Sequence, residues 1–127
     1  MALNRLKGKF SNGKTEVTLN IPIFCYKEND VFVVYSPALD IFGYGNTEQE
    51  SHTSFKVTLD EFLRYTTNKN TLLIELKKLG WKVEKKKKET NISAPDLEEL
   101  LRDNEQFSDI FHNKNYKKAD QQVPVLV

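Results

Sequence analysis

The sequence holds few of the residues that build chemical sites. It has one cysteine, two histidines, five glycines and four prolines in 127 residues, and 18 acidic residues nearly balance 19 basic ones. The single cysteine, Cys25, excludes an internal disulfide framework, which fits a reducing compartment. A net charge of +1 gives no overall field that would attract the chain to nucleic acid or to an anionic membrane.

Long apolar runs are also missing. No uninterrupted run approaches the ~20 residues of a membrane span, and residues 1–13 hold no apolar core of the length that a signal peptide needs. We therefore expect a soluble, cytoplasmic protein without membrane contact. The length predicts one domain with an appendage, which we place as a core over residues 1–91 and an acidic helical extension over residues 92–127.

The residues that carry catalysis form no recognisable set. Gly43-Tyr44-Gly45 lacks the third glycine and the basic residue of a phosphate-binding loop. His52 and His112 are sixty residues apart, and neither belongs to a metal-binding motif. Cys25 lies in an apolar run, where a small buried hydrophobe is the simplest interpretation; as a nucleophile it would need a histidine nearby in space. We expect no enzyme activity, no metal and no cofactor.

Residues 31–63 have the clearest local signals in the chain. Residues 31–35 are β-branched or aromatic, as in a buried strand, and Pro37 ends that strand. Residues 41–44 form a second short strand, beside which Gly43 and Gly45 permit backbone angles that other residues avoid.

A helix is predicted to follow. Thr47 and Glu50 have the spacing of a capping box, and a single apolar stripe then runs along residues 48–65, with Ser51 on the same face. The small Ser51 would let this helix approach the sheet closely.

The remaining segments predict further elements of both kinds. Alternating apolar residues over 15–26 and a polar turn at 27–30 predict an antiparallel meander. Beyond the first helix we expect a second helix over 71–79 capped by Gly80, a strand over 81–85, and one bent helix or two short ones starting with Pro95 as the first helical residue. Residues 113–122 look like a polar connector, and residues 123–127 like an edge strand that docks on its own sheet or on a second subunit.

Two neighbouring segments carry opposite charge. Residues 82–89 hold five lysines and two glutamates, and residues 96–109 hold six acids and one arginine. Solvated surface charge is the plain interpretation. The alternative is a phosphate-binding patch, and its members would be Lys85, Lys86, Lys87 and Lys88.

With these elements in place, the chain resembles the HicB family, the antitoxin half of HicA–HicB toxin–antitoxin pairs. The resemblance covers about residues 21–83, and it depends on the strand at 21–26, the Phe-Val-Val-Tyr-Ser-Pro-Ala-Leu run at 32–39, and Gly43-Tyr44-Gly45-Asn46-Thr47 followed by Glu50. It implies an α+β fold: an antiparallel sheet of three to four strands with a helix on one face, in the order β-β-β-α-(α)-β and partly similar to RNase H. In this chain a helical C-terminal extension follows.

The resemblance also implies a function without catalysis. Members of the family bind a small basic RNase toxin and block its site, and an acidic surface would present such a partner with an imitation of RNA phosphates. The residues that could supply it here are Asp40, Glu48 and Glu50. Many members carry a C-terminal DNA-binding module. Residues 94–127 show neither a helix-turn-helix nor a ribbon-helix-helix pattern, and their acidic first part suits a duplex poorly, so we do not expect DNA binding.

The sequence therefore favours a non-catalytic HicB-like antitoxin-type module that binds a small RNase toxin and forms a homodimer or higher homo-oligomer. Two alternatives stay open. One is a nucleic-acid-binding module using residues 82–88 together with Lys114, Lys117 and Lys118. The other is an orphan dimerisation scaffold that depends on residues 123–127.

Overall fold

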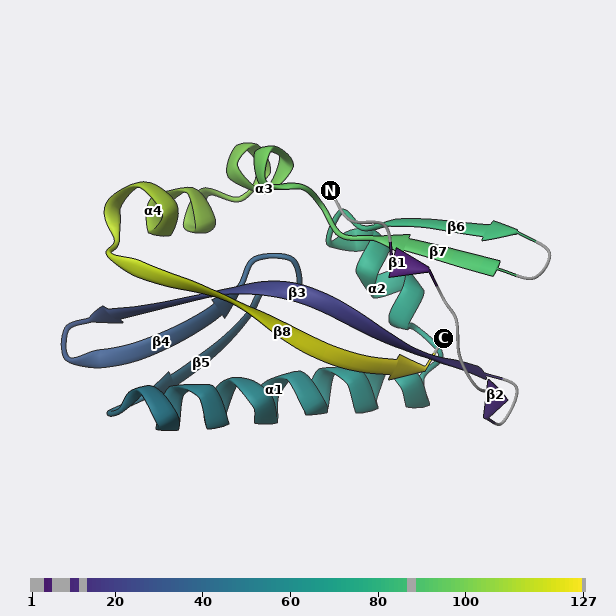
Figure 1. Ribbon diagram of the computed structural model, residues 1–127, viewed down its shortest axis with the longest axis horizontal. Coiled ribbons are helices and arrows are strands. Elements are labelled where there is room, and N and C mark those ends of the chain that lie inside the picture. The colour runs from purple at the N-terminus through teal and green to yellow at the C-terminus, as the bar shows by residue number, and fades with distance from the viewer. Residues whose placement is uncertain (1–3, 6–9, 12–13, 87–88, 127) are drawn as a thin grey trace.

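An antiparallel sheet runs through the middle of the molecule in the computed structural model, with one long helix on one face and two short helices over the other (Figure 1). The structure describes the backbone of residues 4–5, 10–11, 14–86 and 89–126, and the side chains of residues 18–84 and 91–124. The predicted α+β class, with its sheet, its packed helix and its helical C-terminal extension, is confirmed.

The main sheet contains four long strands in the order β8-β3-β4-β5, and the short strand β2 pairs with the start of β3. The bounds of these strands are β2 (Phe10–Ser11), β3 (Lys14–Glu28), β4 (Val31–Ser36), β5 (Ile41–Gly45) and β8 (Tyr116–Leu126). A smaller antiparallel sheet has the order β1-β7-β6, from β1 (Asn4–Arg5), β6 (Lys82–Lys86) and β7 (Glu89–Ser93). The helices are α1 (Glu48–Asn68), α2 (Leu72–Lys78), α3 (Leu97–Asp103) and α4 (Glu105–Asn113).

Both faces of the sheet are covered, because side chains alternate between the two faces of each strand. On one face, Val34 packs in a core cluster with Phe55 and Leu59 of α1. On the other, Tyr35 packs in a second cluster with Phe107 and Ile110 of α4. The second cluster also contains Phe24, Tyr26, Val33 and Leu100. The C-terminal extension is therefore the second cover of the sheet.

The α1 helix lies almost in backbone contact with β5. A Cβ added at Gly43 would lie 2.3 Å from the backbone nitrogen of Phe55 and 2.5 Å from the carbonyl oxygen of Ser51, and one added at Gly45 would lie 2.5 Å from the nitrogen of Ser51. Real Cβ atoms do not approach other atoms so closely. The two glycines lie within β5 and serve this contact. The prediction that they supply unusual backbone angles was wrong, whereas the close approach expected at Ser51 is confirmed.

The strand after α2 lies outside the main sheet. β6 begins one residue later than expected and pairs with β7 in the smaller sheet. The strand beside β3 is β8, which pairs with β3 from Glu16↔Leu126 to Tyr26↔Tyr116. The C-terminal strand thus docks on its own sheet, the first of the two alternatives. It is also longer than predicted, because residues 116–122 belong to it.

Several predicted helix ends are confirmed and one differs. Gly80 follows α2 with a φ of +93°, and Asn104 ends α3 and also caps α4 by accepting a hydrogen bond from the Phe107 N–H at 3.0 Å. The extension is therefore two short helices. Pro95 precedes the N-cap Asp96 and is not the first helical residue, because the Asp96 carboxylate takes the capping position and accepts from the Glu99 N–H.

Within the described residues, no helix is long and apolar enough to cross a membrane. Asn12-Gly13, a dipeptide for which the sequence predicts a tight turn, and Lys87 and Lys88 of the alternative phosphate-binding patch lie outside the described residues. The short strand β2 pairs with β3 at Phe10↔Thr15 and Ser11↔Lys14.

The contact between α1 and β5 predicts a large effect of one methyl group. Gly43→Ala should lower the free energy of unfolding by about 1–3 kcal/mol, because the new Cβ meets helix backbone that cannot give way. Urea denaturation followed by circular dichroism measures this, with Lys56→Ala on the exposed side of α1 as the control, expected within about 0.5 kcal/mol of the parent. Equal stability of the two variants would contradict the backbone contact.

Candidate functional site

The three predicted partner-binding acids do not form one cluster. Asp40 lies in the turn before β5, and Glu48 and Glu50 lie in the first turn of α1, after β5 ends. A five-residue strand separates these two places by roughly 13 Å.

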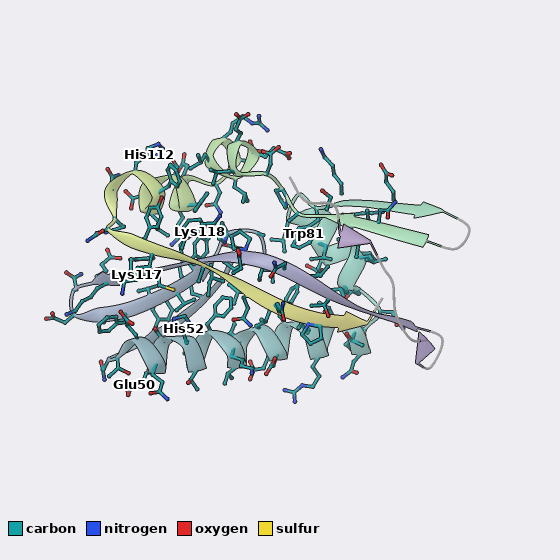
Figure 2. All side chains as sticks on the ribbon, viewed as in Figure 1. Glu50, His52, Trp81, His112, Lys117 and Lys118 are labelled. Atoms are coloured by element: carbon teal, nitrogen blue, oxygen red, sulfur yellow. The ribbon has the colours of Figure 1, made fainter. Side chains whose placement is uncertain are left out.

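Glu50 is held by the helix start (Figure 2). Its carboxylate accepts hydrogen bonds from the backbone N–H groups of Asn46, at 2.8 Å, and Thr47, at 3.2 Å. The Thr47 hydroxyl oxygen in turn accepts from the Glu50 N–H at 3.1 Å, which completes the predicted capping box. Glu48 is exposed and lies 3.6 Å from the ammonium group of Lys117 on β8. Each of these two glutamates thus has a partner within the chain.

Asp40 belongs to a polar chain that links the β4–β5 turn to the α3–α4 junction. The Tyr35 hydroxyl donates to the Asp40 carboxylate at 2.8 Å, and the Asn104 side-chain amide donates to the Tyr35 oxygen at 2.8 Å. Tyr35 is fully buried, and this burial is the main cause that raises the pKa of its phenol. The phenol therefore stays protonated and keeps its donor role.

This link brings Asp40 beside acids that are far away in the sequence. A hollow of about 590 Å³ lies between the β4–β5 turn, the end of α2 and the α3–α4 junction. Its charged lining consists of four carboxylates and one ammonium group: Asp40, Glu99, Asp103, Glu105 and Lys78. We call this surface the acidic hollow. Sequence reasoning noted the acidic segment at 96–109 without joining it to Asp40, and nothing local in the sequence signals that contact.

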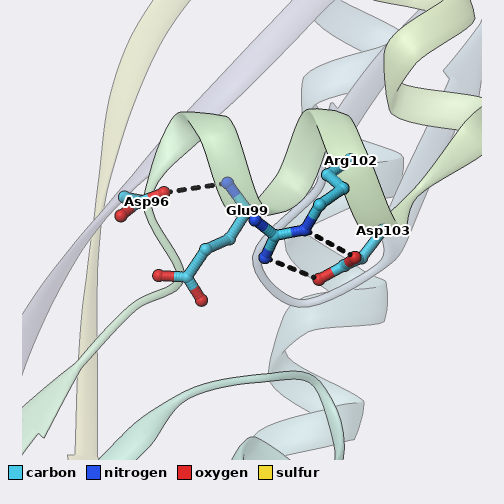
Figure 3. A network of polar contacts seen from close by, with 4 residues as sticks. All are labelled: Asp96, Glu99, Arg102 and Asp103. Atoms are coloured by element: carbon cyan, nitrogen blue, oxygen red, sulfur yellow. Dashed lines mark hydrogen bonds and ion pairs between the residues drawn. The ribbon is translucent and has the colours of Figure 1, made fainter.

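The acids of α3 differ in how far they are neutralised (Figure 3). Arg102 donates to both oxygens of Asp103, at 3.1 and 3.4 Å. Glu99 lies 3.9 Å from the ammonium group of Lys82. The Glu99 N–H holds the pKa of Asp96 below its ordinary value, because it donates to the charged carboxylate. Within the described part of the chain, Glu105 has no ion-pair partner, so it and Asp40 offer the least compensated charge.

A second hollow, of about 410 Å³, lies between β3, β8 and the start of α1. There the Cys25 sulfur lies 3.6 Å from Nε2 of His52, and Figure 2 shows His52 on α1 and Lys117 on β8. Burial, followed by the charge of Glu48, raises the pKa of the Cys25 thiol. A protonated thiol is a weak nucleophile.

Sequence reasoning treated Cys25 and His52 as separate residues. A signal for their proximity was present. The alternation along β3 puts Cys25 on the face of Ile21 and Ile23, and α1 covers that face. His52 is exposed, and Cys25, which the sequence predicted to be a buried hydrophobe, is only half-buried.

Most described lysines of the nucleic-acid alternative face acids. Lys82 lies 3.9 Å from Glu99, and Lys114 and Lys117 lie 3.0 and 3.6 Å from glutamates of β3 and α1. The side chains of Lys85, Lys86, Lys87 and Lys88 lie outside the described residues. Among the residues whose placement is described, no three His, Cys, Asp or Glu side chains converge on a point where a metal ion could bind.

Comparisons with protein-family models, with curated proteins and with solved structures found no match to this chain.

The burial of Tyr26 beside the second hollow predicts a pH dependence of stability. Burial and the charge of Glu28 raise the pKa of Tyr26 from 10.0 to about 12. Between these two values the unfolded chain releases the phenolic proton and the folded chain keeps it, so unfolding becomes easier as the pH rises. Urea midpoints measured from pH 10 to pH 12 should fall more steeply for the parent than for Tyr26→Phe. Parallel curves would show that Tyr26 does not contribute.

Proposed function

We propose that the chain is a non-catalytic, HicB-like antitoxin-type module that binds a small basic RNase toxin and blocks its site. The observation that carries the proposal is residues 36–50. They fold as a bend, a short strand and a capped helix, the arrangement that the family resemblance implies for its motif. The glycines of that motif have a physical role, because they seat α1 on β5.

The charge distribution supports a cationic partner. The acidic hollow collects four carboxylates against one ammonium group from elements that are distant in the sequence. Its two least compensated acids, Asp40 and Glu105, come from the β4–β5 turn and from the first turn of α4. Such a surface raises the association rate of a basic protein and its selectivity over other partners more than it raises the affinity.

The rigidity of the hollow adds to this support. The hydrogen bonds from Asn104 to Tyr35 and from Tyr35 to Asp40 fix the position of Asp40 relative to α4. Asp40 has a φ of 54°, a backbone conformation that aspartate and asparagine tolerate better than most residues. The partner therefore meets a preformed surface, and little ordering cost accompanies binding.

The test uses any small basic protein that a neighbouring gene encodes. The two proteins are co-expressed, the complex is purified, and its affinity and the residual RNase activity are measured. Asp40→Asn with Glu105→Gln keeps the local geometry and removes two charges, so the affinity at low salt should fall about 10- to 100-fold. The residual RNase activity should rise accordingly.

A matched pair on the other side of the molecule provides the control. Asp60→Asn with Glu61→Gln removes the same charge from exposed positions of α1, on the opposite face of the sheet. This pair should leave the affinity unchanged within about 2-fold. Equal losses in both pairs would show a nonspecific charge effect, and failure of the neighbouring protein to bind at all would contradict the proposal.

The nucleic-acid alternative is separated by a titration of the same protein with RNA and with duplex DNA at several salt concentrations. Phosphate contacts would give an affinity that falls steeply with salt, because they release counterions. If the affinity falls steeply with salt and no protein partner binds, nucleic-acid binding is favoured over the antitoxin proposal.

A further inference from the structure

Among the strands that the structure describes, β8 is an open edge of the main sheet. It pairs with β3 on one side over eleven residue pairs, and residues 117–120 are exposed in succession. In Figure 1 it is drawn in front of β3, with no labelled helix or strand in front of it. The opposite edge, β5, is shorter and partly closed, because the Tyr44 N–H donates to the Ser54 hydroxyl of α1 at 3.1 Å. Another strand can therefore add at β8.

The β3–β4 hairpin determines which backbone groups of β8 point outward. Asn29 and Asp30 form its two-residue turn, with φ values of 50° and 65°, so the closing pair Glu28↔Val31 is a hydrogen-bonded pair. Backbone direction alternates along a strand, and Phe24 consequently faces β4 and turns away from β8. Lys118 lies opposite Phe24 and must also point away, toward the open edge.

By the same alternation, four residues of β8 present their backbone N–H and C=O groups outward: Tyr116, Lys118, Asp120 and Gln122. One side-chain contact agrees with this assignment. The Gln122 carbonyl accepts a hydrogen bond from the Gln121 side-chain amide at 3.0 Å, as a carbonyl outside the β3–β8 ladder can. The next outward position is Pro124, which has no N–H to donate, so the available ladder ends there.

Only one register of two such strands joins opposite charges. In an antiparallel pair around a two-fold axis, outward residues must face outward residues. An axis at Lys118 would put Lys118 against its own copy, and an axis at Asp120 would do the same for that carboxylate. An axis at Ala119 puts Lys118 of each copy opposite Asp120 of the other. Neither side chain has an ion-pair partner within the described part of the monomer.

We propose that two copies of this chain pair through β8, antiparallel and around a two-fold axis at Ala119. The two main sheets then join into one continuous sheet. Tyr116–Gln122 forms the shared ladder, with two Lys118–Asp120 pairs beside the axis. Lys117 lies on the other face of β8, so its contact with Glu48 remains intact. This interface does not use the acidic hollow and goes beyond the proposed partner binding.

The test is a charge-reversal set on the full chain without any partner. Sedimentation equilibrium over a concentration series should give a dimer for the parent. Asp120→Lys turns both pairs beside the axis into Lys–Lys pairs, and Lys118→Asp turns both into Asp–Asp pairs, so each variant should weaken the dimer about 30-fold or more. The double variant Lys118→Asp with Asp120→Lys restores opposite charges in the same register and should dimerise like the parent.

Mixing the two single variants provides the sharpest readout. Their heterodimer has only opposite-charge pairs, so a mixture should regain the dimer mass that neither variant shows alone. Asp60→Lys on the exposed side of α1 is the matched control and should leave the mass unchanged. A monomeric parent, single variants that remain dimeric, or a double variant that stays monomeric would each overturn the proposal. If a single variant does not fold, the double variant decides.

Discussion

The backbone contact between α1 and β5 is the constraint on which the rest of the structure depends. No Cβ fits at Gly43, so the helix axis lies as near the strand as two backbones allow. At that distance Phe55 and Leu59 reach past β5 to the side chains of β3 and β4 and complete a core. The capping box at Thr47 and Glu50 starts this helix. Local and tertiary preferences agree here, as expected of a minimally frustrated sequence.

With one face closed, the opposite face of the sheet presents aromatic residues that need cover, and this need explains the short helices. Phe107 meets Phe24 with ring centroids 4.9 Å apart, while Asn104 satisfies the buried Tyr35 hydroxyl. Asn104 thus ends one helix, starts the next and supplies a hydrogen bond to the core. Because it fixes the α3–α4 junction beside Asp40, the same side chain creates the acidic hollow. The side chain that satisfies the buried Tyr35 hydroxyl therefore also positions the acids of the acidic hollow.

The sequence predicted what depends on neighbours along the chain. The capping box at Thr47 and Glu50, the helix end at Gly80 and the alternation of β3 are local signals, and they are confirmed. It did not predict which strand lies beside β3, since both the segment of β6 and the segment of β8 are charged and the polar residues 116–122 of β8 look like a connector. It misjudged Gly43 because a close approach involves a helix that only the tertiary fold brings near. It did not predict that Asp40 lies near Glu99 and Glu105, because that contact also depends on the tertiary fold. The contact between Cys25 and His52 could have been predicted, because the alternation along β3 places Cys25 on the face that α1 covers.

The residues of β8 that oppose aggregation through this edge strand are compatible with a two-fold symmetric dimer. Lysines and a proline on an edge strand normally prevent pairing with other chains. On β8, Pro124 limits the length of any ladder, and Lys118 and Asp120 reject the registers in which each meets its own copy. The remaining register has its two-fold axis at Ala119. In such an isologous contact, the open β8 edges of both copies pair with each other. The proposed dimer uses the β8 edge of each copy, and the far edge, β5, is partly closed by Ser54. Val123 does not take part, since it is buried in the core cluster that α1 completes. In the proposed dimer, the charges of Lys118 and Asp120 therefore determine the register.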